Sequence, residues 1–368
     1  MALQRLPGFV VEYLEGGAES ESTLHRNRIA FDELRFVRRV LVDVATRSTA
    51  TTLLGAPAAL PLAISPTGFN GILWKHGDIA LARVAKQYGV PFTASIVASD
   101  SLEEIAKQAG GRLWMMLLVL RDPKVFGRLI ERAEAAGYEA LVLTLDAPVL
   151  GNRTWDNRNF GEPLKLTLRA KLDVLAHLRW LFGVFLPGGL PGFGNLAELL
   201  PAGQNSPLDG SRYLTAQSNQ SLTWDGVRLL RDRWKKKLVL KGVMTAADAE
   251  LAIEVGADAV ILSNHGGRQL DSELAPIDVL EEVIAAVGSR IEVLIDGGFR
   301  RGTDIAKALA LGARGVMLGR STLYGLAAGG EAGAARALEL LKLELDRTLA
   351  LLGCPSLEAL TPDRVRRA

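Results

Sequence analysis

The chain has 368 residues, and 43 Lys and Arg against 41 Asp and Glu give it a formal net charge of +2. This balance produces no overall positive field, so we expect no nucleic-acid partner. An apolar fraction of 48% indicates a folded globule, and the single cysteine, Cys354, excludes an internal disulfide. The first residues lack the apolar stretch and cleavage site of a signal peptide, so we expect a cytoplasmic protein.

From about residue 60, short apolar runs alternate with amphipathic segments of helical period. The runs cover residues 61–67, 91–95, 113–119, 140–146, 238–243, 259–264, 293–298 and 315–320. Their continuous apolarity is typical of parallel strands covered on both faces. Eight such units predict one α/β domain over residues 1–368, a (β/α)8 TIM barrel. A doubly wound open sheet is the alternative, but no GxGxxG motif follows a strand. Residues 1–59 are then an N-terminal helical cap, and a closing helix begins at about residue 331.

One interruption of this alternation is large. Roughly ninety residues separate Asp146 from the fifth expected strand, far more than a βα connection needs. We assign residues 147–215 to a long loop after strand four. Its uncharged part, Trp180 to Asn195, is too short to cross a bilayer and follows Arg169, Lys171 and Arg179. The segment is a lid over the barrel mouth, an in-plane membrane-surface segment, or both at once, and membrane binding would place the protein peripherally on the cytoplasmic membrane.

Polar residues gather where the expected strands end. They are Thr67-Gly68, Thr144 and Asp146, Lys241, Ser263 to His265, Asp296 to Gly298, and Gly319-Arg320. Active sites of TIM barrels form at these strand ends, and a charge there is costly unless it is paired or used. The last two segments, DGGFRRG and GRS, combine glycine amides with Arg300 and Arg320, which predicts a phosphate site. This pattern does not distinguish a phosphorylated substrate from a cofactor.

The charged strand ends indicate two kinds of chemistry. Lys241 is suited to forming a Schiff base, as in aldolases, or to neutralising an anion. His265 with Asp146 nearby is a candidate general base, because the carboxylate stabilises the imidazolium that forms on protonation. Arg268 is placed to hold a substrate carboxylate beside that base, and Arg153 is a candidate second clamp.

Several of these motifs resemble those of a known family. The segments SNHGGRQLD, LVLKGV, LTLDAPVLGNR, DGGFRRGTDIAKALALGA and VEYLEGGAES resemble the FMN-dependent α-hydroxy acid oxidases and dehydrogenases over nearly the whole chain. The segment HLRWLFGVFLPGGLPGFGNL looks most like the bacterial, membrane-associated branch that contains the mandelate dehydrogenases. The resemblance implies FMN as cofactor, oxidation of a 2-hydroxy acid to the 2-oxo acid, and a homotetramer. The electron acceptor stays open between oxygen, a quinone and a partner protein.

The resemblance also implies a role for each matched residue. His265 takes the substrate proton while electrons reach the flavin N5, and Asp146 orients and stabilises it. Arg268, Arg153 and Tyr13 bind the substrate carboxylate. Lys241 lies against the flavin N1/O2 edge. The remaining implied cofactor contacts are Ser95, Thr67, Thr144 and Ser263 around the ring system, Asp296 on the ribityl chain, and Gly298, Arg300, Gly319 and Arg320 on the phosphate.

Some positions depart from the family pattern and bear on the substrate. Met116 stands where the family has a flavin-binding glutamine, and Leu118 where it has a tyrosine that meets the substrate hydroxyl. Gly68 and Val97 replace bulkier residues of the glycolate-specific relatives. We expect a bulky or aromatic, mandelate-like substrate. The alternative is a flavin-dependent oxidase of a different, less polar substrate in a biosynthetic pathway. A non-catalytic flavoprotein is disfavoured by the five polar site positions.

Overall fold

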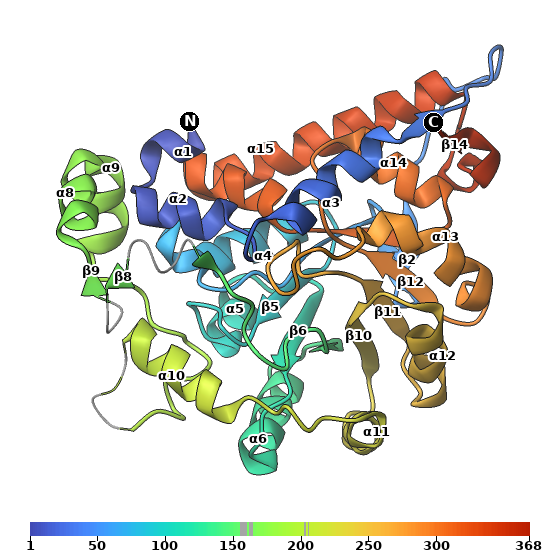
Figure 1. The fold of residues 1–368 in the computed structure, drawn as a ribbon. Helices are drawn as coiled ribbons and strands as arrows, with labels where there is room; N and C mark the ends of the chain where they lie inside the picture. Colours follow the sequence, from blue (N-terminus) through green and yellow to red (C-terminus); the bar gives the residue numbers. More distant parts are fainter. Residues whose placement is uncertain (155–159, 162–164, 202–203, 205) are drawn as a thin grey trace.

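Eight parallel strands form a closed barrel at the centre of the computed structural model, which describes residues 1–154, 160–161, 165–201, 204 and 206–368 (Figure 1). The strands are β4 (Leu62–Ile64), β5 (Phe92–Ser95), β6 (Leu113–Leu118), β7 (Ala140–Thr144), β10 (Lys237–Val243), β11 (Ala259–Leu262), β12 (Glu292–Ile295) and β13 (Gly315–Leu318). They are hydrogen-bonded in this order, and β13 pairs with β4 to close the barrel. The predicted (β/α)8 architecture is thereby confirmed.

The barrel strands are apolar along their length because helices cover them outside and side chains fill the inside. Every residue of β4, β5, β7, β11 and β13 is buried. Strand β10 differs, because Lys241 lies buried within it. A charged side chain inside a buried strand needs partners, which marks this end of the barrel as a site of polar chemistry.

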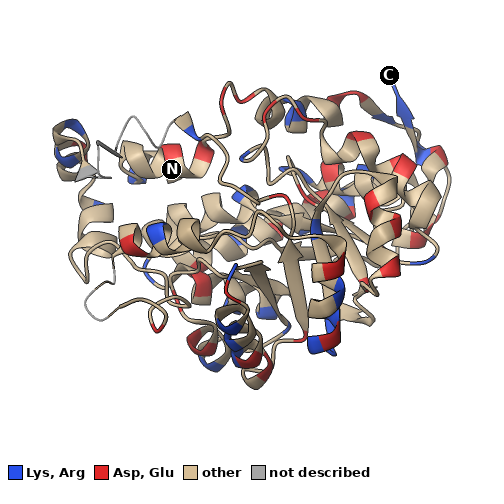
Figure 2. Ribbon diagram, turned by 60° about the horizontal axis from the view of Figure 1, so that its bottom comes forward, with Lys and Arg blue, Asp and Glu red and all other residues tan. Residues whose placement is uncertain are grey.

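A ring of helices surrounds the barrel. Its members are α4 (Gly77–Gln87), α5 (Leu102–Gln108), α6 (Pro123–Ala135), α11 (Trp224–Arg233), α12 (Ala246–Glu254), α13 (Pro276–Val287), α14 (Gly302–Ala310) and α15 (Arg320–Leu352). Side chains of Ser101, Asp122 and Thr245 cap α5, α6 and α12 by accepting a backbone N–H. The predicted closing helix is the second half of α15, since Gly329 and Gly330 kink that helix just before residue 331. Figure 2 shows acidic and basic segments interspersed over the outer helices.

The N-terminal segment is only partly helical, which corrects the expectation for residues 1–59. Helices α1 (Ala2–Arg5), α2 (Gly8–Glu15) and α3 (Ser22–Asp32) are followed by β1 (Leu34–Phe36), β2 (Thr51–Leu53) and β3 (Ala56–Ala58). Strands β2 and β3 form a hairpin because Leu54 and Gly55 both adopt positive φ, the turn that suits twisted strands. Strand β1 pairs with β14 (Val365–Arg367) at the far end of the chain, which η3 (Leu357–Ala359) and η4 (Pro362–Arg364) precede.

The segment predicted as a long loop, residues 147–215, contains secondary structure of its own. It holds β8 (Phe160–Gly161), β9 (Lys165–Leu166), α8 (Leu168–Ala176), α9 (Leu178–Trp180), a π-helical turn η2 (Leu181–Phe185) and α10 (Pro207–Gln217). Residues 155–159, 162–164, 202–203 and 205 of that prediction lie outside the described residues. Helices α8 and α9 lie at one side of the molecule, next to α1 and α2 (Figure 1). Within the described ranges, no helix is long and apolar enough to cross a membrane.

Candidate active site

A cavity of about 190 Å³ opens at the carboxyl ends of the barrel strands. Most of the predicted site residues line it: Tyr13, Thr67, Gly68, Ser95, Met116, Arg153, Lys241, His265, Arg268, Asp296, Gly298, Arg300, Gly319 and Arg320. Asp146 and Ser263 lie behind this wall, each in contact with a residue that lines it. Leu118 and Thr144 end neighbouring strands in register with each other and are not part of the wall.

His265 and Asp146 form a close pair at the cavity. The Nδ1 atom of His265 is 3.1 Å and 3.2 Å from the two carboxylate oxygens of Asp146. Burial lowers the pKa of His265, and the positive charges of Lys241 and Arg153 lower it further against the opposing effect of Asp146. Burial by itself raises the pKa of Asp146, but the charges of His265 and Lys241 outweigh it, and the pKa lies below the usual value. The pair therefore combines a neutral imidazole with an ionised carboxylate at neutral pH.

Lys241 is held by two partners inside the barrel. Its Nζ donates to Ser263 Oγ over 2.7 Å and lies 3.5 Å from Asp296 Oδ2. The side chain of Lys241 is only 4% exposed, so its charge acts in a poorly solvated environment. The same Ser263 Oγ accepts the backbone N–H of His265 over 3.1 Å, which links the lysine to the histidine turn.

Two arginines fasten the end of α2 over the cavity. Arg320 donates to the carbonyl oxygens of Leu14, Gly16 and Gly266, and Arg268 donates to those of Tyr13 and Gly16. Burial and the charge of Arg300 lower the pKa of Arg320 to about 10, so it stays protonated at neutral pH. These bonds carry Tyr13 to the barrel mouth, where its hydroxyl donates to Gly68 O over 3.0 Å.

Four buried polar atoms at the strand ends have no hydrogen-bond partner in the described part of the chain. They are Ser65 Oγ, Thr67 Oγ1, Thr144 Oγ1 and Asp296 Oδ1. Such atoms are costly inside a protein unless a ligand satisfies them. A flavin mononucleotide offers ring nitrogens and oxygens and ribityl hydroxyls as partners, so Ser65, Thr67 and Asp296, which line the cavity, fit the cofactor. Ser65 was missed from the sequence, although it directly follows β4, inside the first apolar run.

Gly68 and Val97 meet in the lining of the cavity, next to the hydroxyl of Tyr13. A Cβ atom at Gly68 would overlap Val97 Cγ2, so the two residues share one small volume. Met116, which is 4% exposed, adds its thioether to the same wall. Apolar lining residues such as Leu14, Met317 and Leu323 were also missed, because nothing in an apolar residue distinguishes a cavity wall from a core in sequence.

Comparison with known proteins identifies relatives that resemble this chain over almost its whole length. The family described as FMN-dependent dehydrogenase matches residues 2–367. The chain is 46% identical to an (S)-mandelate dehydrogenase of Pseudomonas putida, over 98% of this chain and 90% of that protein. It is 40% identical to an L-lactate oxidase of Nostoc sp. (strain PCC 7120), over 97% of this chain and 93% of that protein. A solved structure of the monotopic membrane protein (S)-mandelate dehydrogenase superposes with a TM-score of 0.95 at 44% identity, covering 100% of this chain and 97% of that one.

Proposed function

The chain belongs to the family of FMN-dependent dehydrogenases, which act on 2-hydroxy acids, and on that basis we propose that it oxidises a bulky or aromatic, mandelate-like member of this class. The product is the corresponding 2-oxo acid. The observation that carries the proposal is the pair of His265 and Asp146 at the cavity, with Arg153 and Arg268 beside it. This arrangement suits a hydroxy acid, because the base can remove a proton from the substrate while the two arginines bind its carboxylate.

FMN, when bound, supplies an acceptor for the two electrons that leave the substrate. The residues of the cavity wall that would hold it are Ser65, Thr67 and Asp296, through the buried polar atoms described above. Lys241 adds a buried positive charge next to Asp296. The amides and side chains around Gly298 and Gly319, with Arg300 and Arg320, would take the phosphate.

His265 acts as the base in this proposal. Its Nδ1 is turned toward Asp146, which leaves Nε2 for a proton from the substrate. Because the lowered pKa keeps the ring neutral at neutral pH, the lone pair is available before reaction. Once the proton is taken, the negative charge of Asp146 stabilises the imidazolium. Arg153, Arg268 and Tyr13 orient the substrate carboxylate so that the proton to be removed faces the ring.

The size of the substrate is inferred from the apolar wall. Val97 packs directly against Gly68, where a Cβ atom would overlap its Cγ2, and Met116 presents no strong hydrogen-bond group. An aryl or branched alkyl group on the α-carbon suits this wall. Met116 also favours the second candidate, oxidation of a less polar substrate than a simple hydroxy acid.

The test is the visible spectrum of the purified holoenzyme under anaerobic conditions, before and after separate additions of mandelate, lactate and glycolate. Bleaching by mandelate at a higher rate than by glycolate supports the proposal. A yellow protein that none of the three bleaches refutes it and leaves the second candidate. The control is His265→Ala, which should keep its FMN and lose the bleaching, because the cavity stays while the base is removed.

We also propose that α8, α9 and η2 bind the membrane surface. Within α8, and again through α9 and η2, apolar side chains recur at intervals of three or four residues and are exposed: Leu168, Leu172, Leu175, Leu178, Phe182 and Leu186. Leu168 is 74% and Phe182 is 64% exposed. The opposite face is docked on the protein, where buried Trp180 donates to Ile72 O over 2.7 Å. Exposed Arg169, Lys171 and Arg179 flank the apolar face and suit anionic headgroups.

Sedimentation with vesicles containing anionic phospholipid tests this surface. Leu172→Glu together with Phe182→Glu should abolish co-sedimentation, and removal of residues 176–196 should do the same while flavin chemistry remains. The matched control is Leu351→Glu on α15, since Leu351 is 68% exposed but lies away from the segment. Vesicle binding that survives the double substitution would refute the assignment.

A further inference from the structure

The residues around His265 form a tight turn of unusual backbone conformation. His265 has a φ of 57°, and Gly266 and Gly267 follow with 65° and 76°. Histidine rarely occupies this left-handed region, so the surrounding structure has to hold it there. The Gly267 N–H donates to the Asn264 backbone oxygen over 3.0 Å and lies 3.2 Å from Asn264 Oδ1. Asn264 therefore closes the turn with its backbone and its side chain.

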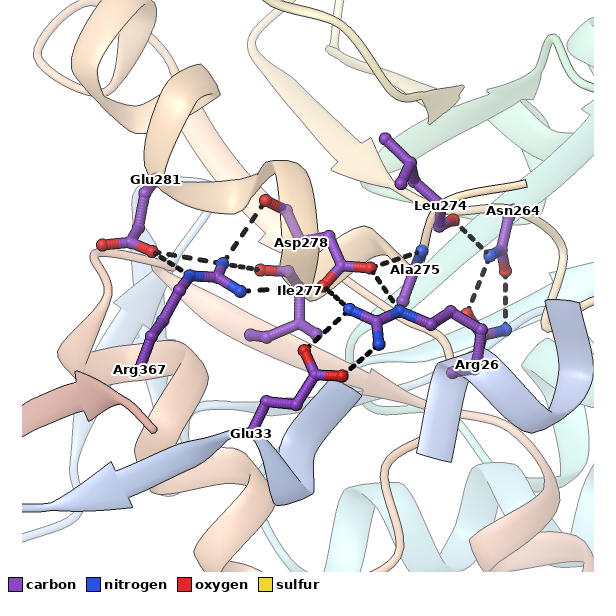
Figure 3. Close-up of polar contacts among 10 residues, drawn as sticks. Arg26, Glu33, Asn264, Leu274, Ala275, Ile277, Asp278, Glu281 and Arg367 are labelled. Atoms are coloured by element: carbon purple, nitrogen blue, oxygen red, sulfur yellow. Dashed lines mark hydrogen bonds and ion pairs between the residues drawn. The ribbon is translucent and has the colours of Figure 1, made fainter. Parts of the chain in front are cut away.

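The side chain of Asn264 is held in turn by Asn27 of α3. Asn27 Nδ2 donates to Asn264 Oδ1 over 2.9 Å, and Asn264 Nδ2 donates back to Asn27 Oδ1 over 2.8 Å. Asn264 Nδ2 also donates to Leu274 O over 3.0 Å (Figure 3). Both asparagines are 1% exposed. A buried amide whose donors and acceptor are all engaged has a single orientation.

Helix α3 is itself fixed to the barrel on either side of Asn27. Arg26 binds both carboxylate oxygens of Asp278 on α13, over 2.9 Å and 2.7 Å, and also pairs with Glu33 (Figure 3). Arg28 pairs with Asp304 on α14 over 2.8 Å. The bidentate contact in particular leaves the helix little freedom to slide or rotate. Asn27 thus offers the histidine turn a rigid support.

We propose that Asn27 is a positioning residue for His265, holding the left-handed turn through Asn264 so that the imidazole keeps its alignment with Asp146. The proposal rests on the proposed function, in which His265 is the base. In this proposal the side chain and the backbone of Asn27 have different roles. The backbone oxygen of Asn27 lies against Gly298, where any side chain would overlap it, so the backbone shapes the predicted phosphate loop. A change of side chain should therefore affect the base and spare the cofactor.

The experiment compares wild type with Asn27→Leu, which keeps the volume and removes the amide. Anaerobic mixing with mandelate gives the limiting rate of flavin bleaching and the apparent dissociation constant of the substrate. We expect the limiting rate to fall by about tenfold or more, since small misplacements of a reacting group have effects of this order. The dissociation constant and the FMN content should stay unchanged. Ile29→Ala is the matched control, because Ile29 lies on the same helix and is 53% exposed.

A second readout does not depend on turnover. Diethylpyrocarbonate modifies unprotonated imidazoles, so the rate of modification across pH reports the reactivity and the pKa of His265. His265→Ala provides the baseline of the other three histidines in the chain of four. We expect Asn27→Leu to change both the rate and the apparent pKa of His265, because the ring loses its fixed place beside Asp146. If no hydroxy acid bleaches the wild type, the proposed function fails, and this readout alone decides the role of Asn27.

The outcomes separate positioning from a purely structural role. A purely structural asparagine would lower the unfolding temperature while leaving the bleaching rate and the modification profile of His265 at wild-type values, and that result overturns the proposal. Should Asn27→Leu not fold, Asn27→Ser is judged by the same two measurements. Simultaneous loss of FMN in a folded variant would also overturn the proposal, because it would mean that the side chain supports the cofactor loop instead of the base.

Discussion

Replacing Asp146 with Asn tests how the site uses its buried charge. Both carboxylate oxygens lie within hydrogen-bond distance of His265 Nδ1. The substitution keeps the shape of the side chain and removes the negative charge that stabilises the protonated ring. An asparagine amide can also donate to Nδ1, which moves the ring proton to Nε2 and blocks the position where the substrate proton should arrive. Both effects slow proton transfer and leave the binding arginines in place.

The expected loss follows from the geometry of the pair. Unit charges about 4 Å apart attract by about 4 kcal/mol at an effective dielectric of about 20, so loss of the charge alone corresponds to at most about 1,000-fold in rate. The side chains are 24% and 13% exposed, so water screens part of this attraction. A charge-assisted hydrogen bond is worth about 1.5–3 kcal/mol, or about 10- to 150-fold in rate. We expect the limiting rate of flavin reduction to fall by at least about 10-fold, and by more where the amide also blocks Nε2.

Anaerobic stopped-flow bleaching of the bound flavin measures this loss directly. Because Asp146 raises the pKa of His265, its removal should also move the acid limb of kcat/KM to lower pH. Asp258→Asn is the control, since Asp258 pairs with Lys237 near the amino end of the barrel strands. A reduction rate for Asp146→Asn equal to that of wild type would refute the electrostatic reasoning, whatever the effect on stability.

Three further outcomes are expected. Lys241→Met leaves Asp296, which is 7% exposed, without its cation, so the unfolding free energy should fall by about 3–5 kcal/mol. The reduction potential of bound FMN should also become more negative. An unchanged reduction potential would contradict the placement of Lys241 at the cofactor. In Gly68→Ala the added methyl group contacts Val97, so kcat/KM should fall more for mandelate than for glycolate. Combining Gly68→Ala with Val97→Ala should restore part of the kcat/KM for mandelate. Equal effects on both substrates would argue against an aryl group at this wall. The kcat/KM of the wild type should fall only at pH below 6.5, because His265 must be unprotonated to act as the base and its pKa is lowered from the ordinary value of 6.5. An acid limb centred above pH 6.5 would show that burial is not the dominant influence on this ring.

The sequence predicted the barrel well because its strands are buried on both faces and therefore read as continuous apolar runs. It predicted their ends poorly. The run at residues 61–67 contains a strand that ends at Ile64, since hydrogen bonding to the neighbouring strands, and not composition, sets the boundary. The pairing of β1 with β14 was not predictable either. It joins Leu34 to Arg367 across almost the whole chain, and Val365–Arg367 carries no clear strand pattern.

The candidate site divides in the same way. Charged residues at strand ends, such as Lys241 and His265, could be predicted because burial makes an idle charge costly there. The contacts that hold these side chains in place could not be predicted from the sequence. The mutual amide bonds of Asn27 and Asn264 join residues 237 positions apart, and an asparagine in a helix has many possible partners. That Arg268 and Arg320 bind carbonyls of α2 is likewise a result of packing that no local pattern encodes.

The attachment of α2 has a consequence for the order in which the molecule assembles during synthesis. The carbonyls of Leu14 and Gly16 are made before their donor Arg320, which follows at separations of 306 and 304 residues. Contacts between residues so far apart in sequence form late, after the loop between them has closed. The bonds from Arg320 to the end of α2 therefore form only after the eighth strand, which precedes Arg320, has been made. Before that point, contacts with earlier residues hold α2, such as the bond from the Gly8 N–H to Asp173.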